Sequence, residues 1–141
     1  MAKRVNLALR KQEAFQALQR KDFARAERLL RQVCKGAPRD AQAWFFLGAT
    51  YGELGRYERA VECCRRVLEL EPNNAPALMN LGNAQACLGR HEAAAEAYRR
   101  ALELAPEDPA VLYNYGKALS LAGRHEEAVE CLRRVVAKRL N

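Results

Sequence analysis

A period of 34 residues constrains this chain more than any other feature of its sequence. Glycines recur at this spacing in two series, Gly48, Gly82 and Gly116, and Gly55, Gly89 and Gly123. Prolines follow the same step at positions 38, 72 and 106. A fixed period near 34 is the signature of stacked helical hairpins, which bury their apolar faces against their neighbours. The sequence therefore predicts an all-α solenoid, and each local motif has to be interpreted by its place in the repeat.

Each repeat carries signals for the ends of its two helices. Asp40, Asn74 and Asp108 lie where a first helix begins, and their side chains can accept a hydrogen bond from a free backbone N–H group there. Glycine follows each first helix because it can adopt the left-handed conformation that closes a helix. Pro72 and Pro106 follow the second helices, since proline disfavours helical geometry in the residue before it. These signals predict three clear repeats, at 41–74, 75–108 and 109–141.

The stretch from Trp44 to Tyr51 reads Trp-x-x-Leu-Gly-x-x-Tyr and is followed by Ala60, Cys64 and Pro72. This pattern resembles the tetratricopeptide repeat (TPR), and it is similar to the repeat regions of O-linked N-acetylglucosamine transferases and of other TPR scaffold proteins. The resemblance implies a right-handed α-α superhelix of about four stacked hairpins. It also implies a single domain over residues 1–141.

Residues 7–40 fit the same register as a degenerate first repeat. Its Ala14, Ala26 and Leu30 occupy the expected slots. It departs from the other repeats in two places, with Glu13 where they have Leu or Tyr and Lys21 where they have Gly.

Basic residues are concentrated in the first quarter of the chain. The formal net charge is +7, and residues 1–40 carry eleven Lys or Arg against four Asp or Glu, whereas residues 41–141 carry thirteen of each sign. We expect the basic first repeat to contact an acidic partner. Binding of nucleic acid through it is a less favoured alternative, because no interleaved aromatic residues support base stacking. A mitochondrial-type presequence is another interpretation of the basic amino terminus.

Composition disfavours several classes of function. The longest apolar run, residues 43–51, is about half the roughly 20 residues that a membrane span needs, so we expect no membrane partner. The chain has one Ser and one Thr, and no nucleophile–base pair or phosphate-binding loop is recognisable. We therefore predict a non-catalytic protein that needs no cofactor. An odd number of cysteines, five, and the lack of an export signal predict reduced thiols and a cytoplasmic location.

The segment HEAAAE, from His91 to Glu96, resembles half of a metalloprotease helix motif with Cys87 upstream. That motif needs a second histidine four residues on, and this position holds Ala95. Tyr57 and His125 occupy the same slot in the neighbouring repeats, so we interpret His91 as a structural or solvent-facing residue at the start of a second helix. The remaining cysteines are interpreted as packing residues, with a redox-active Cys63–Cys64 pair as the alternative, and no metal site is predicted.

The first helices of TPR proteins line a concave surface, and the resemblance places peptide-binding residues around the Leu–Gly pair of each repeat. In this chain they are Lys11, Gln12 and Phe15; Gln42, Phe45, Phe46 and Ala49; Met79, Asn80 and Asn83; and Tyr113, Asn114 and Lys117. Asparagine amides offer both a donor and an acceptor, so they can hold a peptide backbone whatever its side chains. The alternative is that these asparagines only cap helices or solvate the inner wall.

Some TPR proteins bind a free C-terminal carboxylate with two Lys, two Asn and an Arg. Asn83 and Asn114 match the two asparagines, but Met79 stands where the first lysine is expected. In the preceding frame Phe45 and Ala49 replace a Lys–Asn pair. Because this clamp is incomplete, we do not expect binding of a free carboxyl terminus.

The leading hypothesis is a scaffold that binds an extended peptide or a partner protein in its concave groove. The alternative is the substrate-recruiting N-terminal module of a larger glycosyl- or sulfotransferase. We expect the last hairpin to expose apolar residues such as Leu119, Val129 and Val136. A homo-oligomer, a swapped helix or a further domain would cover such a surface.

Overall fold

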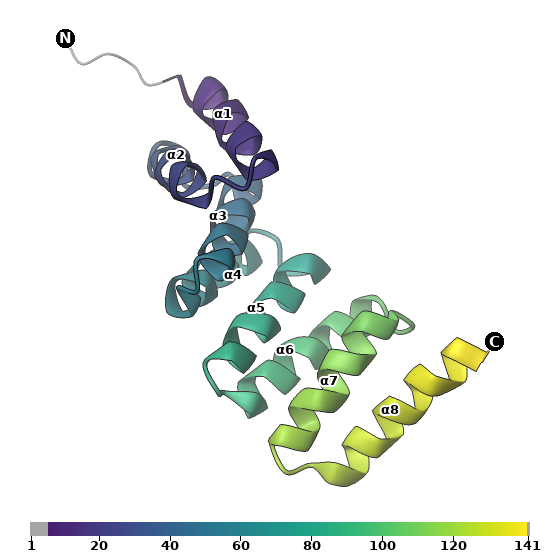
Figure 1. Cartoon of the computed structure of the whole chain (residues 1–141). Helices are drawn as coiled ribbons and strands as arrows, with labels where there is room; N and C mark the ends of the chain where they lie inside the picture. Colours follow the sequence, from purple (N-terminus) through teal and green to yellow (C-terminus); the bar gives the residue numbers. More distant parts are fainter. Residues whose placement is uncertain (1–5, 141) are drawn as a thin grey trace. The chain divides into compact units, whose positions relative to one another are not determined.

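The computed structural model describes residues 6–140, which form helices joined by short turns (Figure 1). In chain order they are α1 (Leu7–Gln19), α2 (Phe23–Gly36), α3 (Ala41–Glu53), α4 (Tyr57–Leu70), α5 (Ala75–Cys87), α6 (His91–Leu104), α7 (Pro109–Leu121) and α8 (His125–Leu140). They divide into a first unit, which ends at Pro72, and a second unit, which begins at Asn73. The single domain over residues 1–141 stays a prediction. Residues 1–5 of the suggested presequence lie outside the described residues.

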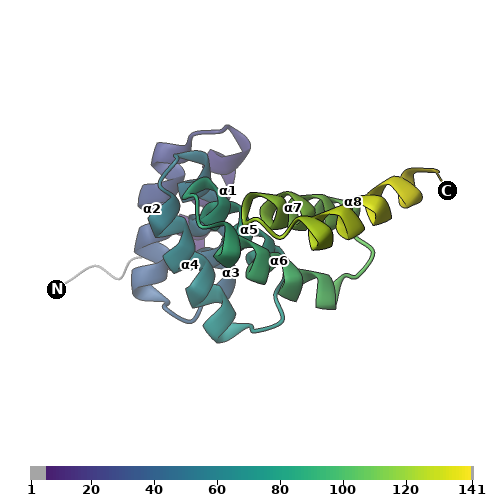
Figure 2. The same ribbon diagram turned by 90° about the horizontal axis from the view of Figure 1, so that it is seen from below.

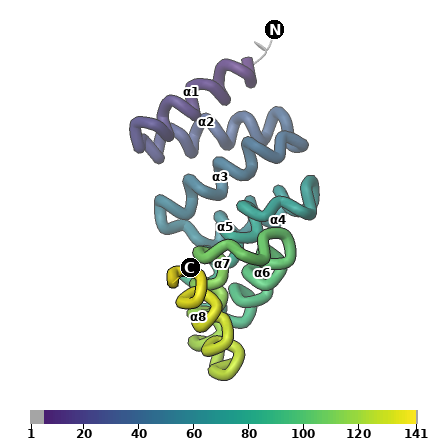
Figure 3. The backbone as a smooth tube through the Cα atoms, turned by 90° about the vertical axis from the view of Figure 1, so that its right-hand side faces the viewer, coloured from purple at the N-terminus to yellow at the C-terminus, as the bar shows by residue number. Residues whose placement is uncertain are grey.

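The first unit consists of two hairpins, α1 with α2 and α3 with α4, and α2 packs against α3 (Figure 3). In α2 the residues Ala26, Leu29, Leu30 and Val33 are all buried. Their spacing of three and four residues places them on one side of a helix, so α2 has an apolar stripe and leaves its other side to charged residues. The core of this unit therefore lies between the two hairpins as well as inside each of them.

The second unit repeats this plan with α5 against α6, α6 against α7, and α7 against α8 (Figure 2). Leu78, Ala94, Ala101 and Leu112 are buried in its core. In both units the odd-numbered helices are the first helices of their hairpins and the even-numbered helices are the second.

The predicted helix starts are confirmed by side-chain hydrogen bonds. The backbone N–H groups of the third residues of α3 and α5 donate to the side chains of Asp40 (3.1 Å) and Asn74 (3.0 Å). Asp108 accepts from the N–H of Ala110 at 3.0 Å, and Pro109 occupies the first helical position. Each cap satisfies a donor that the helix itself leaves unpaired.

The predicted left-handed glycines are also found. Gly55, Gly89 and Gly123 have φ angles of 73°, 76° and 84° where each first helix turns into the second. Lys21 has a φ of 58° at the same slot of the degenerate repeat. The first hairpin thus makes the same turn with a residue for which this conformation costs about 1 kcal/mol.

The glycine inside each of the first helices α3, α5 and α7 permits close packing of the two helices of a hairpin. A Cβ atom added at Gly48 would lie 3.0 Å from the Cβ of Cys63, and one added at Gly82 would lie 2.5 Å from the ring of Tyr98. The series of glycines identified in the sequence is therefore fixed by helix contact within each hairpin.

The exposure predicted for the last hairpin is partly wrong. Val129 and Val136 are exposed as expected, but Leu119 has an exposed fraction of 0%. Its equivalents in the two preceding repeats, Tyr51 and Gln85, are buried too, so this slot faces the interior. Among the described residues, no helix is both long and apolar enough to cross a membrane.

Candidate functional site

In the first unit the predicted site residues form an aromatic surface on α1 and α3. The ring centroids of Phe15 and Phe46 are 4.9 Å apart, and those of Phe46 and Phe45 are 5.4 Å apart, both in edge-on arrangements. All three rings are half-buried. Gln42 is exposed and Ala49 is half-buried on the same helix. This surface offers apolar contact with few polar groups to direct a ligand.

Lys11 has a structural partner. Its Nζ donates to both carboxylate oxygens of Asp40, at 2.9 and 3.2 Å, and so joins α1 to the start of α3. Partial burial acts to raise the pKa of the Asp40 carboxyl, but the hydrogen bonds from Lys11 and from the backbone outweigh it and lower the pKa overall. Lys11 therefore stabilises the first helix pair, while the neighbouring Gln12 is exposed.

In the second unit the structure brings three predicted residues into one pocket. Asn83 on α5 and Asn114 and Lys117 on α7 line a cavity of about 330 Å³ together with Tyr98 on α6. The first helices α5 and α7 supply the two amides and the ammonium group, and the second helix α6 supplies His91 and Tyr98. Two amides and an ammonium group thus face one space.

The amide of Asn83 has a defined orientation. The hydroxyl of Tyr98 donates to its Oδ1 at 2.6 Å. Burial, with a smaller contribution from Cys87, raises the pKa of Tyr98 to about 12, so the phenol keeps its proton at neutral pH. Because Oδ1 is occupied, the NH₂ group of Asn83 is left as a donor for a ligand carbonyl.

The other predicted residues of this unit lie outside the pocket lining. Met79 and Asn80 are half-buried on α5, and 51% of Tyr113 is exposed on α7. Asn80 shares its repeat slot with Asn114 but does not line the pocket.

Sequence reasoning missed Tyr98, His91 and Cys87 as neighbours of the site. All three line the pocket, and the Nδ1 atom of His91 is buried with no hydrogen-bond partner. A signal for Tyr98 was available, because it is the one hydroxyl in a slot that otherwise holds Leu30, Cys64 and Leu132. A buried hydroxyl in an apolar slot requires a polar partner nearby, here Asn83.

Four of the five cysteines are buried as packing residues in the structure. Cys34, Cys63, Cys64 and Cys131 are buried, whereas Cys87 is exposed. Burial raises the pKa of Cys64 to about 11, which leaves its thiol protonated at neutral pH. Within residues 6–140 no group of three or more His, Cys, Asp or Glu side chains lies close enough to hold a metal ion.

Family models of the tetratricopeptide repeat match residues 12–75, 50–109 and 88–141. The chain belongs to the TPR family. The TPR fold class predicted from the sequence is thereby confirmed, as an all-α superhelical arrangement of helical hairpins. The similarity to O-linked N-acetylglucosamine transferases in particular stays a prediction.

Solved structures of MamA are similar to this TPR protein. A crystal structure of MamA has a TM-score of 0.90 at 21% identity and covers 95% of this chain and 78% of its own. MamA from AMB-1 has a TM-score of 0.88 at 26% identity, with 94% and 72% covered. The structure of MamA from residue 41 to its end, from Desulfovibrio magneticus RS-1, has a TM-score of 0.90 at 24% identity, with 96% and 77% covered. A comparison of the sequence with curated proteins gave no significant match.

Proposed function

We propose that this TPR protein is a protein-interaction scaffold that binds an extended peptide segment on the first helices of its second unit. The TPR family and the likeness to MamA support the role of scaffold. The peptide-binding role rests on one observation, the convergence of Asn83, Asn114 and Lys117 on the pocket between α5 and α7.

The chemistry of the pocket suits a peptide backbone. An extended chain presents carbonyl and N–H groups at intervals of about 3.3 Å per residue. The NH₂ group of Asn83 donates to a carbonyl, because its oxygen already accepts from Tyr98. The amide of Asn114 has no partner within the described chain and can both donate and accept.

Lys117 and Tyr113 add selectivity to this backbone recognition. Lys117 is exposed at the pocket and makes no ion pair in the described part of the chain, so it favours a ligand with a carboxylate at this point. The exposed ring of Tyr113 provides apolar contact on the same helix. The expected ligand is an extended segment with an acidic residue, held with a Kd of about 10 µM.

The aromatic surface of the first unit supports a second apolar contact. Phe15, Phe45 and Phe46 hold one another in place, so little side-chain freedom is lost when a ligand covers them. This surface contacts aliphatic or aromatic side chains and has few groups that could form hydrogen bonds with a peptide backbone.

A peptide array followed by fluorescence anisotropy tests the proposal. Extended peptides recovered on the wild-type chain are titrated against Asn114→Ala and Lys117→Ala. Each loss of a hydrogen bond or ion pair is expected to weaken binding about fivefold. Tyr98→Phe removes the bond that orients Asn83 and should weaken binding while leaving the helix content unchanged.

The control is Asn73→Ala, which removes an exposed amide before α5 and outside the pocket. Its affinity should equal that of the wild type. If Asn114→Ala and Lys117→Ala bind every recovered peptide as tightly as Asn73→Ala does, the pocket is not the binding site.

A further inference from the structure

A second cavity lies in the first unit, on the side of the second helices. It has a volume of about 1140 Å³, with walls from α2 and α4 and a floor from α3. We call it the α2–α4 cleft. None of the residues that carry the proposed peptide site lines it, so it requires its own explanation.

The α2 wall of the cleft is cationic. Arg28, Arg31 and Lys35 lie three and four residues apart and therefore follow one stripe of the helix. All three side chains are exposed. Arg31 approaches Glu27 at 3.8 Å, while Arg28 and Lys35 form no ion pair with any described residue. Three positive charges thus face the cleft with little internal compensation.

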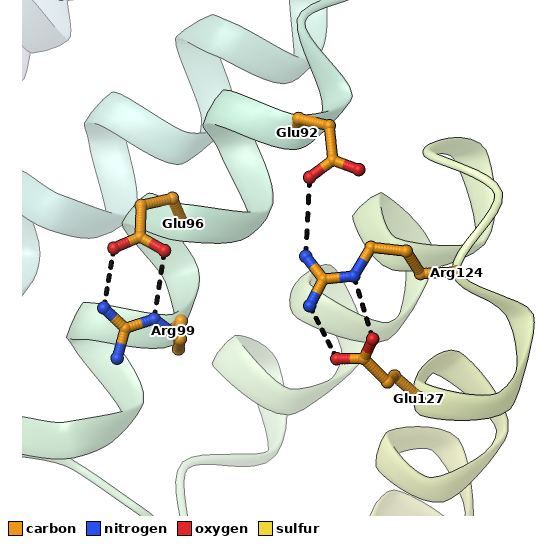
Figure 4. Close-up of polar contacts among 5 residues, drawn as sticks. All are labelled: Glu92, Glu96, Arg99, Arg124 and Glu127. Carbon is orange, nitrogen blue, oxygen red and sulfur yellow. Dashed lines mark hydrogen bonds and ion pairs between the residues drawn. The ribbon is translucent and has the colours of Figure 1, made fainter.

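This charge pattern is peculiar to the first repeat. The slots of Arg28 and Lys35 hold Glu62 and Glu69 in α4, and Glu96 and Glu103 in α6. In α6 those glutamates neutralise the arginine between them: Glu96 accepts from Arg99 at 2.6 and 3.0 Å (Figure 4), and Glu103 accepts from it as well. The TPR fold accommodates acids at both slots, so helix formation does not require the cations of α2.

The floor of the cleft is apolar and rigid. Leu47 and Tyr51 are buried there, and Trp44 is half-buried with its Nε1 donating to the carbonyl oxygen of Pro38 at 2.8 Å. Burial, with a smaller contribution from Asp40, raises the pKa of the Cys34 thiol beside them to about 12, so this thiol adds no charge. The floor therefore accepts apolar side chains.

The residues of the α4 wall disfavour a nucleic acid as the ligand of the cleft. The guanidinium of Arg66 lies 5.7 Å from the Trp44 ring centroid and that of Arg59 lies 5.8 Å from the Tyr51 ring centroid, so both rings already have a cationic neighbour. Glu62 lies between the two arginines along α4 and also lines the cleft. A continuous phosphate backbone along the cleft would meet this carboxylate, which disfavours a nucleic acid.

The spacing of the cations defines the ligand more narrowly. Arg28 and Lys35 are seven residues apart, which is about 10 Å along a helix. A partner helix that lies along α2 presents carboxylates at the same interval when they are seven residues apart. Residues one and five positions after the first carboxylate lie on the adjacent face of that helix, so apolar side chains there face the floor.

We propose that the α2–α4 cleft binds an acidic amphipathic helix of a partner protein, whose carboxylates pair with Arg28 and Lys35 and whose apolar side chains cover Trp44. This binding site is separate from the peptide site on α5 and α7 and does not depend on it. Its recognition is electrostatic at the α2 wall and apolar at the floor.

The test uses the complete chain and a designed helical peptide of sixteen residues, with Glu at positions seven apart and Leu and Phe between them. Trp44 is the only tryptophan, so its fluorescence reports directly on the cleft. The wild type should bind the peptide with a change in that fluorescence. Arg28→Glu/Lys35→Glu, which introduces the residues found at these slots in α4 and α6, should weaken binding about tenfold.

Arg28→Gln/Lys35→Gln should fall between the wild type and the charge reversal. The matched control is Arg133→Glu/Arg139→Glu on α8, which makes the same change in net charge at two exposed positions outside the cleft. Its affinity should stay within about twofold of the wild type, since distant exposed charges are screened by salt.

Four results would overturn the proposal. The wild type could fail to bind the peptide, the α8 control could lose as much affinity as the α2 variant, or the same peptide with Gln for Glu could bind equally well. A single-stranded oligonucleotide of equal charge that binds more tightly than the peptide, with the same loss in the α2 variant, would assign the cleft to nucleic acid instead. The result for Asn114→Ala, which tests the separate peptide site on α5 and α7, does not change any of these outcomes.

Discussion

In the second unit the guanidinium of Arg99 lies between the carboxylates of Glu96 and Glu103, whereas its equivalent in the first unit, Arg31, lies between Arg28 and Lys35. The helices α2 and α6 are the second helices of two different repeats and have equivalent apolar stripes. One has a surface that neutralises itself, and the other has a surface that leaves positive charge available. The comparison separates what the TPR fold requires from what a ligand requires.

The first helices of the hairpins differ in the opposite direction, because there the polar side chains belong to the second unit. The first unit presents three phenylalanine rings on α1 and α3, and the second unit presents two asparagines and a lysine on α5 and α7. The proposed polar recognition thus uses the first helices of one unit and the second helices of the other. A protein with two such surfaces can hold two different segments without competition between them.

The largest expected difference between the units is at the helix caps. Asp40→Ala removes the cap of α3 and leaves Lys11 without its partner, so we expect it to lower the free energy of unfolding by about 2 kcal/mol. Asp108→Ala removes a cap alone and should cost about 1 kcal/mol. Urea denaturation followed by circular dichroism measures both. Equal losses would show that the Lys11–Asp40 pair adds nothing to the first unit.

The same pair predicts a pH dependence for the first unit. The pKa of Asp40 is lowered in the folded protein, so its carboxylate binds fewer protons when folded than when unfolded. Its contribution to stability is therefore present at neutral pH and is lost as the pH falls below about 4 and through the lowered pKa. Asp40→Asn keeps a capping oxygen and should remove this part of the acid sensitivity.

A smaller difference is expected at the turn between the two helices of a hairpin. Lys21 adopts the left-handed conformation that glycine adopts at Gly55, Gly89 and Gly123. We expect Lys21→Gly to raise the free energy of unfolding by about 0.5–1 kcal/mol, because relief of strain exceeds the entropy that glycine adds to the unfolded chain. Gly89→Lys should lower it by a similar amount. Thermal melts of both variants check the pair, and a destabilised Lys21→Gly would contradict it.

The period of the sequence predicted the helices, their caps and their turns because each signal acts within a few residues. The left-handed Lys21 shows how strongly the period constrains the chain, since the turn forms there without glycine. Leu119 was placed wrongly because its exposure was inferred from its position in the last hairpin, while its slot faces the interior in every repeat.

The candidate sites were predictable only in part. The asparagines were found through their repeat slots, but the bond from Tyr98 that orients Asn83 joins two helices and has no local signal beyond a hydroxyl in an apolar slot. The α2–α4 cleft was not predicted as a cavity. Its excess of positive charge was visible in the first repeat, yet its aromatic floor depends on α3 packing against both α2 and α4.

The smallest expected effect distinguishes most directly whether the charges on α2 stabilise the helix or bind a ligand. Arg28→Glu/Lys35→Glu gives Arg31 two acidic neighbours, three and four residues away, and so copies the arrangement around Arg99. Each such pair stabilises a helix by about 0.2–0.5 kcal/mol, so the variant should unfold at a slightly higher urea concentration than the wild type. Glu96→Arg/Glu103→Lys, the reverse exchange in α6, should lower stability by a similar amount.

A variant that gains stability while it loses the acidic helix would show that the cations of α2 are retained at the expense of the fold. Such an exchange is expected of a binding surface and has no explanation in packing, because the three side chains are exposed. If Arg28→Glu/Lys35→Glu instead destabilises the chain by more than about 1 kcal/mol, the cations contribute to the fold of the first unit itself. The contrast between α2 and α6 would then reflect a difference in structural context, with no need for a ligand.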